Sequence, residues 1–148
     1  MPNKKQQGNL GEISALKEFL KYGFKVSLPF GDNTSYDLIV EDNSNTLYKI
    51  QVKSSEQINK DGVYKFSTSK KRINTQGNYT KSYEKNEVDY FVLYGVSLDE
   101  LYILKFDEVG TNDTCIRVEP PKRKGGTIPK MREDYLFSKR VNELFILK

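Results

Sequence analysis

Apolar residues recur at three- and four-residue intervals near the start of the chain, a spacing that is typical of an amphipathic helix. The apolar positions are Leu10, Ile13, Leu16, Phe19 and Leu20. Asn9 is a favourable N-cap residue, and Glu12 follows it at the spacing of a capping box. Gly23 is typical of the position just beyond a helix end. The pattern therefore predicts a helix over residues 9–21 that buries this apolar stripe.

Alternating apolar and polar residues predict strands in much of the remaining chain. The segments are residues 24–30, 36–40, 47–53, 62–69, 88–96, 100–108 and 114–121. We expect 36–40 and 47–53 to form a hairpin, joined by a polar turn at residues 42–46. The segment 88–96 is the most apolar, which predicts a central strand covered on both faces, with 100–108 as its hairpin partner.

Three further segments complete the prediction of the fold. Residues 70–86 are basic and polar, and their composition is typical of a loop, as is that of the basic segment 122–130. Residues 132–147 are compatible with a helix. The order of one helix, several strands and a terminal helical segment predicts an α/β or α+β fold. At this length we expect one domain over residues 1–148.

Composition indicates a soluble intracellular protein. Charged residues make up 30% of the chain, and no apolar run approaches the ~20 residues that span a bilayer, so we expect no membrane association. The first residues lack the apolar core of a signal peptide. A single cysteine, Cys115, cannot form an internal disulfide, which predicts a reducing, cytoplasmic location.

The chain contains no histidine, and this narrows its possible chemistry. Catalysis by Ser-His-Asp or Cys-His groups within the chain is excluded, as is an ordinary zinc site of His and Cys ligands. A metal ion would need oxygen ligands, which points to a hard cation such as Mg²⁺. A general base would be a lysine, a carboxylate or metal-bound water.

The hairpin over residues 36–53 carries the residues on which such chemistry could depend. Gln51 and Lys53 are two apart on one predicted strand, so their side chains share a face. Asp37 joins that face if it lies opposite Gln51, whereas a slip of one residue would send it to the other face. A carboxylate and an amide oxygen suit a divalent cation, and the Lys53 ammonium suits an orienting or charge-stabilising role.

Glu12 could add a second carboxylate, because it borders the predicted buried stripe of its helix. Each of these residues also has a simpler interpretation. Glu12 could cap its helix, and Asp37 could be an exposed polar residue of a strand. Gln51 and Lys53 could belong to the solvated face of an amphipathic strand.

The order of these residues resembles the PD-(D/E)XK nuclease superfamily, in which a helix carries Glu, one strand carries Asp and the next carries (D/E)-x-K. The closest resemblance is to a branch that includes a cyanobacterial group I intron homing endonuclease. The similar segments are GNLGE (8–12), VSLPFGDNTSYDLIV (26–40), IQVKS (50–54), EVDYFVLYGVSLDELYIL (87–104), IRVEPP (116–121) and EDY (133–135). Tyr36 replaces the usual proline, and Gln51 replaces the usual acidic residue, as it does in that branch.

The resemblance implies a restriction-endonuclease-like core, with a central mixed β-sheet flanked by helices. It implies Glu12, Asp37, Gln51 and Lys53 as the catalytic set, with Asp37, Gln51 and Glu12 holding Mg²⁺, which Mn²⁺ can replace. It also implies sequence-specific cleavage of double-stranded DNA by a homodimer or homotetramer. Alternatives are a structure-specific nuclease that resembles junction resolvases, and a catalytically inactive DNA-binding module.

Two basic stretches are the candidates for DNA contact. The net charge is +4, and segregated basic residues favour a polyanionic partner, although solvated loops have the same composition. The predicted DNA-binding residues are Lys70, Lys71, Arg72 and Lys81 in the first stretch, and Lys122, Arg123, Lys124, Lys130 and Arg132 in the second. We expect the lysines to contact phosphates and the arginines to read bases.

Overall fold

The computed structural model describes the chain except for residues 1, 32, 75, 124, 127 and 148, and it describes residues 71–74 and 78–80 by their backbone alone. In chain order the elements are α1 (Lys4–Lys21), β1 (Lys25–Ser27), β2 (Leu38–Glu41), β3 (Leu47–Ser55), β4 (Val63–Ser67), β5 (Lys70–Asn74), β6 (Gly77–Lys81), β7 (Tyr90–Gly95), β8 (Glu100–Lys105), the 3₁₀ turn η1 (Phe106–Glu108), β9 (Asp113–Arg117), α2 (Arg132–Tyr135) and α3 (Phe137–Leu144). No helix in these described parts is long and apolar enough to cross a membrane.

Helix α1 begins five residues earlier than its apolar pattern predicts. Asn3 is the N-cap, and it forms a capping box with Gln6 in which each side chain accepts a hydrogen bond from the other residue's backbone N–H. The predicted cap at Asn9 is therefore wrong. Glu12 lies well inside the helix, so its interpretation as a capping residue is wrong as well.

The predicted end of α1 is confirmed. Gly23 has a φ of 89°, which places it in the left-handed region just after the last helical turn. Its N–H donates to the carbonyl of Leu20 at 3.0 Å, and the N–H of Phe24 donates to the carbonyl of Phe19 at 3.1 Å. These two bonds form a Schellman motif, which satisfies carbonyls that the helix end would otherwise leave unpaired.

The buried face of α1 differs from the predicted apolar stripe. Its buried residues are Gln7, Gly11, Ala15 and Phe19, at four-residue spacing, whereas Leu10, Ile13 and Leu20 are exposed. The reason is steric. A Cβ on Gly11 would lie 2.3 Å from Ser54 Oγ and 3.4 Å from Val52 Cγ1 of β3, so small residues let the helix approach the sheet closely.

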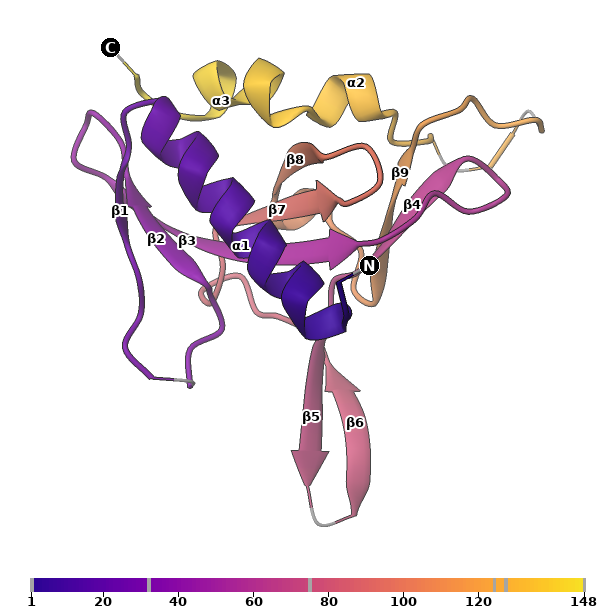
Figure 1. Cartoon of the computed structure of the whole chain (residues 1–148), viewed down its shortest axis with the longest axis horizontal. Helices are drawn as coiled ribbons and strands as arrows, with labels where there is room; N and C mark the ends of the chain where they lie inside the picture. The colour runs from indigo at the N-terminus through magenta and orange to yellow at the C-terminus, as the bar shows by residue number, and fades with distance from the viewer. Residues whose placement is uncertain (1, 32, 75, 124, 127, 148) are drawn as a thin grey trace.

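Five strands form a mixed sheet in the order β1-β2-β3-β7-β8. Strands β3 and β7 are parallel, and the other neighbours are antiparallel. Helices α1 and α3 pack on one face of this sheet, as Figure 1 shows, and the two-stranded β4–β9 sheet covers the other. The predicted fold class, a central mixed sheet flanked by helices, is confirmed.

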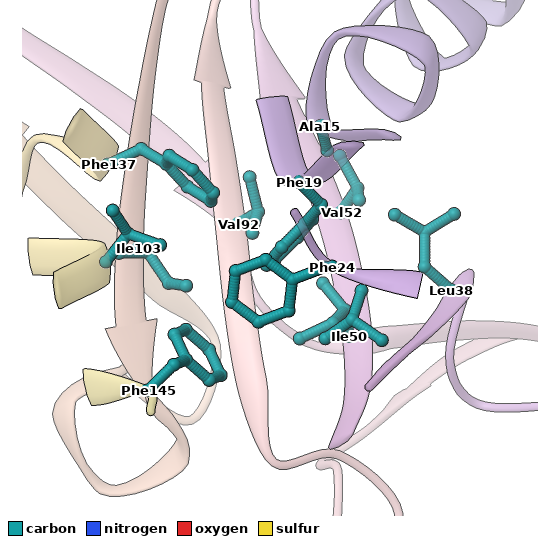
Figure 2. Packing of buried hydrophobic residues seen from close by; sticks show 12 residues of the cluster. Ala15, Phe19, Phe24, Leu38, Ile50, Val52, Val92, Ile103, Phe137 and Phe145 are labelled. Carbon is teal, nitrogen blue, oxygen red and sulfur yellow. The ribbon is translucent and has the colours of Figure 1, made fainter. Parts of the chain in front are cut away.

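The core under the helices is rich in aromatic side chains that meet edge to face (Figure 2). The ring of Phe19 lies 5.0 Å from that of Phe24 and 4.9 Å from that of Phe137, at interplanar angles of 79° and 87°. Such pairs add to the stabilisation that comes from burying apolar area. Residues from α1, the sheet and α3 all belong to this cluster, so it fixes the helix against β3.

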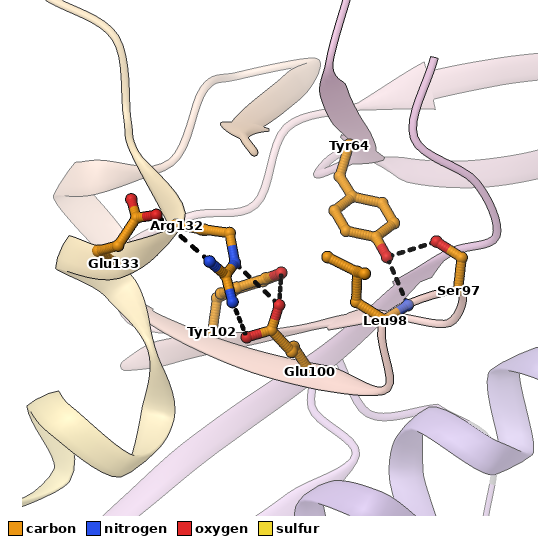
Figure 3. Close-up of polar contacts among 7 residues, drawn as sticks. All are labelled: Tyr64, Ser97, Leu98, Glu100, Tyr102, Arg132 and Glu133. Atoms are coloured by element: carbon orange, nitrogen blue, oxygen red, sulfur yellow. Dashed lines mark hydrogen bonds and ion pairs between the residues drawn. The ribbon is translucent and has the colours of Figure 1, made fainter. Parts of the chain in front are cut away.

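A second core lies between the sheet and β4–β9, so β7 is covered on both faces as predicted. Tyr64 of β4 is fully buried there, and its hydroxyl accepts a hydrogen bond from the N–H of Leu98 at 2.9 Å (Figure 3). Gly95 makes room for this ring, because a Cβ there would lie 2.6 Å from Tyr64 Cζ. The turn after β7 is thus held to β4.

The predicted loop over residues 70–86 is wrong in part, because β5 and β6 form an antiparallel hairpin within it. Register runs from Lys70 opposite Lys81 to Asn74 opposite Gly77, and the hairpin extends away from the rest of the molecule in Figure 1. It is a sheet of its own, without a strand pairing to the main sheet. The sequence of this hairpin is mostly polar and basic and shows no hydrophobic alternation, which explains why the sequence pattern did not reveal it.

Two glycines of α1 give a matched test of its contact with β3. We expect Gly11→Ala to destabilise the protein by about 1–2 kcal/mol, because the new methyl group would overpack against Ser54 and Val52. Gly8 has no atom within 4 Å of an added Cβ, so Gly8→Ala should stabilise it by up to about 1 kcal/mol through helix propensity. Urea denaturation measures both. Equal stabilisation by the two substitutions would contradict the close approach.

Candidate active site

The β2–β3 register places Asp37 beside Gln51, as the sequence analysis required. Leu38 is paired with Ile50, and the N–H of Asp37 donates to the carbonyl of Ile50 at 2.8 Å. Oδ2 of Asp37 accepts a hydrogen bond from the N–H of Val52 at 2.9 Å. These two bonds lie on either side of Gln51 along β3. The turn predicted at residues 42–46 is confirmed, with the N–H of Asp42 donating to the carbonyl of Thr46 at 3.1 Å.

Asp37, Gln51 and Lys53 line one cleft of about 430 Å³. The other lining residues are Thr34, Ser35, Ser54, Ser67, Ser69, Lys70 and Tyr83. Every side chain in this set carries a polar or charged group, so the cleft suits a polar, charged ligand better than an apolar one. The three residues predicted to share a face of the hairpin therefore converge on one concave surface.

Glu12 reaches this site from α1. Burial raises the pKa of Glu12 to about 7, and the negative charge of Asp37 and a hydrogen bond with its carboxyl group add to the shift. The two carboxyl groups are thus close neighbours, and each disfavours ionisation of the other. The close packing of α1 on β3 at Gly11 brings Glu12 to this position. The structure therefore unites all four residues of the predicted catalytic set.

The donor set fits a divalent cation held by oxygens. Two crowded carboxylates resist simultaneous ionisation, and a bound cation would remove that conflict. Among the described residues, no group of three or more His, Cys, Asp or Glu side chains gathers for such an ion, so a third side-chain donor would be an amide or a hydroxyl group. Gln51 meets this need, because its Nε2 donates to the carbonyl of Val52 at 3.3 Å and leaves its Oε1 as the accepting atom.

Lys53 is held by contacts on the β4–β5 side of the cleft. Its Nζ donates to the carbonyl of Ser69 at 3.5 Å and lies 5.4 Å from the centre of the Tyr83 ring. That ring packs edge to face against Phe91 of β7, with centres 5.4 Å apart. Tyr83 is therefore anchored to the second core and places an electron-rich face beside the ammonium group.

Sequence reasoning missed the carboxylate of Glu87, which pairs with Lys70 next to this cleft. Ser35 Oγ and the N–H of Glu84 also donate to it. Burial alone would raise the pKa of Glu87, but hydrogen bonds from Lys70 and Ser35 outweigh it and lower the pKa to about 2. These partners are 17 and 52 residues away in sequence, so no local motif could have revealed them.

The predicted DNA-binding residues lie in different surroundings. Lys81 on β6, and Lys122 and Arg123 in the loop after β9, are exposed, and Lys130 is half-buried beside that loop. Lys70 is buried in the cleft, and Arg132 donates two hydrogen bonds to the carboxylate of Glu100, as Figure 3 shows. The side chains of Lys71 and Arg72, and the whole of Lys124, lie outside the described residues.

The depressed pKa of Glu87 predicts a pH dependence of stability. Its pKa falls from 4.5 to about 2 on folding, so its charge stabilises the folded state above pH 4.5. This contribution is lost as the pH falls from 4.5 toward 2. Glu87→Gln removes the titrating group, so the stability difference between wild type and variant should narrow between pH 6 and pH 3. Urea denaturation across this range measures it, and a constant difference would contradict the assignment.

Comparison with known proteins assigns this arrangement to a family. The family model described as PD-(D/E)XK endonuclease matches residues 2–138. A solved structure, that of the bacterial homing endonuclease I-Ssp6803I, is similar with 28% sequence identity and a TM-score of 0.75, covering 95% of this chain and 93% of that chain. The search of curated proteins gives no match. The predicted restriction-endonuclease-like fold is thereby confirmed.

Nucleases of this type generally use divalent metal ions, in agreement with the oxygen donors of the cleft. The match extends over nearly the whole chain and includes α1, the β2–β3 hairpin and β7. The chain therefore belongs to the PD-(D/E)XK endonuclease family, the members of which are DNA-cleaving hydrolases.

Proposed function

We propose that the protein is a Mg²⁺-dependent, sequence-specific endonuclease that cuts double-stranded DNA, as a homing endonuclease does. The observation that carries this proposal is the convergence of Asp37, Gln51 and Lys53 on one polar cleft, with the carboxyl group of Glu12 next to Asp37. The similarity to a homing endonuclease over both chains supports the finer assignment. Residues 1–148 are proposed to form one nuclease domain. Since the proposed substrate is DNA, the proposed location of the protein is inside the cell.

Asp37, Glu12 and the amide oxygen of Gln51 are the proposed ligands of Mg²⁺, which Mn²⁺ can replace. When bound, such an ion polarises the phosphate and lowers the pKa of its water. Asp37 is held for this role by two hydrogen bonds to β3, so its second carboxylate oxygen has little freedom. Gln51 contributes an oxygen without adding a third negative charge to the crowded pair.

Lys53 is proposed to orient the attacking water or to stabilise the charge that develops on the phosphate. The Ser69 carbonyl and the Tyr83 ring hold its ammonium group in the cleft. This preformed position of the Lys53 ammonium group matters, because a side chain that had to rearrange during the reaction would raise the activation barrier for cleavage. Asp37 and Lys53 thus act from neighbouring strands on one phosphate.

The β5–β6 hairpin is proposed to contact DNA next to the cleft. A two-stranded ribbon fits the major groove of B-DNA, and β5 begins at Lys70, which lines the cleft. The proposed contacts from this hairpin include Lys71, Arg72 and Lys81. The loop after β9, with Lys122, Arg123, Lys124 and Lys130, is the second proposed contact.

Lys70 and Arg132 remain candidates for DNA contact, although each is already paired with a glutamate.

The proposal also includes self-assembly of the protein. Two active sites in one assembly can cut both strands of a duplex in a single encounter, and we therefore propose a homodimer or homotetramer in solution. Sedimentation equilibrium measures this oligomeric state directly.

Substitutions in the cleft test the catalytic assignment. We expect Asp37→Ala and Lys53→Ala to lower Mg²⁺-dependent cleavage by about 10²–10³-fold while DNA binding persists, because each removes a charge that acts on the reacting phosphate. Lys49→Ala is the matched control, since Lys49 lies on the same strand and its Nζ binds the carbonyl of Asn86 outside the cleft. Cleavage of DNA that flanks the protein's own gene, with Mg²⁺ or EDTA, measures the effect.

The same assay separates the proposed function from its alternatives. Full cutting by Asp37→Ala and Lys53→Ala would refute the residue assignment. Preference for four-way junctions over every linear duplex would favour a structure-specific nuclease. Salt-sensitive DNA binding by the wild type without cleavage in Mg²⁺ or Mn²⁺ would favour a DNA-binding module.

Salt dependence tests the proposed DNA contacts. Each lysine or arginine that binds a phosphate contributes about 0.9 to the slope of log K against log salt concentration. We therefore expect Lys81→Gln and Lys122→Gln each to reduce the slope by about one. Lys21→Gln is the control, because Lys21 is exposed at the far end of α1 and pairs with Glu18. An equal effect of all three would mean that general charge, not these sites, determines affinity.

A further inference from the structure

Three segments of the cleft wall meet at the carboxylate of Glu87. Ser35 Oγ donates to it from the segment that leads into Asp37. Lys70 pairs with it from the first residue of β5. The N–H of Glu84 donates to it at 2.9 Å, from the residue next to Tyr83. We call these contacts the Glu87 cluster.

The Lys70–Glu87 pair is more buried than an ordinary surface ion pair. The Lys70 side chain is 8% exposed and that of Glu87 is 23% exposed. Charges at such sites lose hydration, so each depends strongly on its partner. The low pKa of Glu87 agrees with a carboxylate that stays ionised at neutral pH. A buried cation is thus maintained at the wall of the cleft.

Lys70 and the proposed catalytic Lys53 share a neighbour. Their Nζ atoms lie 5.3 Å and 5.4 Å from the centre of the Tyr83 ring. Two ammonium groups near one ring repel each other, and the carboxylate of Glu87 offsets the charge of one of them. Glu87 therefore fixes where Lys70 lies relative to Lys53.

We propose that Glu87 is a positioning residue of the nuclease site, which fixes the Lys70 ammonium and the Ser35–Asp37 segment next to each other in the lining of the cleft. The inference rests on the proposed function. Glu87 itself does not line the cleft. It acts through Lys70, which faces the DNA phosphate from the cleft wall, and through Ser35, which is two residues from Asp37.

Glu108 provides a matched control for this role. It pairs with Arg140, and the two side chains are 26% and 12% exposed, close to the values for Glu87 and Lys70. Neither Glu108 nor Arg140 lines the cleft. Loss of charge at Glu108 therefore tests what a comparable buried ion pair contributes to stability alone.

The experiment compares single-turnover cleavage by wild type, Glu87→Gln and Glu108→Gln in Mg²⁺, well below the melting temperature of each. Both variants should lose stability. Glu87→Gln alone should cut about 10–100-fold more slowly, the range seen when groups that support a site are removed, with DNA affinity changed less than about threefold. Ser35→Ala keeps the ion pair and should fold normally, and we expect it to slow cleavage by about 3–10-fold.

Equal cleavage rates for Glu87→Gln and Glu108→Gln, or wild-type cleavage by Ser35→Ala, would overturn the positioning role. If Glu87→Gln does not fold, Ser35→Ala decides the question by itself. A wild-type protein that fails to cut in Mg²⁺ or Mn²⁺ would instead refute the proposed function, and the inference with it.

Discussion

The crowding of Glu12 and Asp37 is the constraint that the rest of this structure has to maintain. Two carboxyl groups near each other, one of them partly buried, oppose folding unless a proton or a cation lies between them. Gly11 lets α1 approach β3, and the aromatic cluster around Phe19 holds it there. Asp37 is fixed from its own side by Ile50 and Val52. The core thus maintains a contact that electrostatics alone would break.

Such conflicts are typical of functional sites, where residues are arranged for chemistry at some cost in stability. The conflict here has a chemical solution, because a divalent cation turns the repulsion of two carboxylates into shared ligation. Gln51 adds a neutral donor, and Lys53 and Lys70 place positive charge on the remaining wall. In the proposed function, the oxygen donors would hold the cation and the two ammonium groups would face the phosphate.

Local patterns in the sequence predicted the parts of this arrangement that local interactions determine. The β2–β3 hairpin, with Asp37 beside Gln51, follows from alternation and a short polar turn. The helix end at Gly23 follows from backbone conformation. The prediction of which face of α1 is buried was wrong, because burial there depends on the small size of Gly11 and Ala15 rather than on hydrophobicity.

Contacts between distant segments could not be predicted in this way. Glu87 meets Ser35 and Lys70 because the order β3-β7 brings parallel strands together, which no spacing in the sequence encodes. The β5–β6 hairpin was missed because its polar, basic sequence shows no apolar alternation. The position of Glu12 beside the predicted buried stripe made it a candidate for the site, and the family resemblance implied its catalytic role.

The most direct test is an NMR titration of the Glu12 side-chain carboxyl carbon, with and without Mg²⁺ and in Asp37→Asn. Without metal, Glu12 in the wild type should titrate near pH 7. Mg²⁺ should lower this pKa, because the cation favours the ionised form, and Asp37→Asn should lower it by removing the neighbouring charge. A Glu12 pKa near 4.5 that neither Mg²⁺ nor the substitution changes would contradict the close pairing of the two carboxylates.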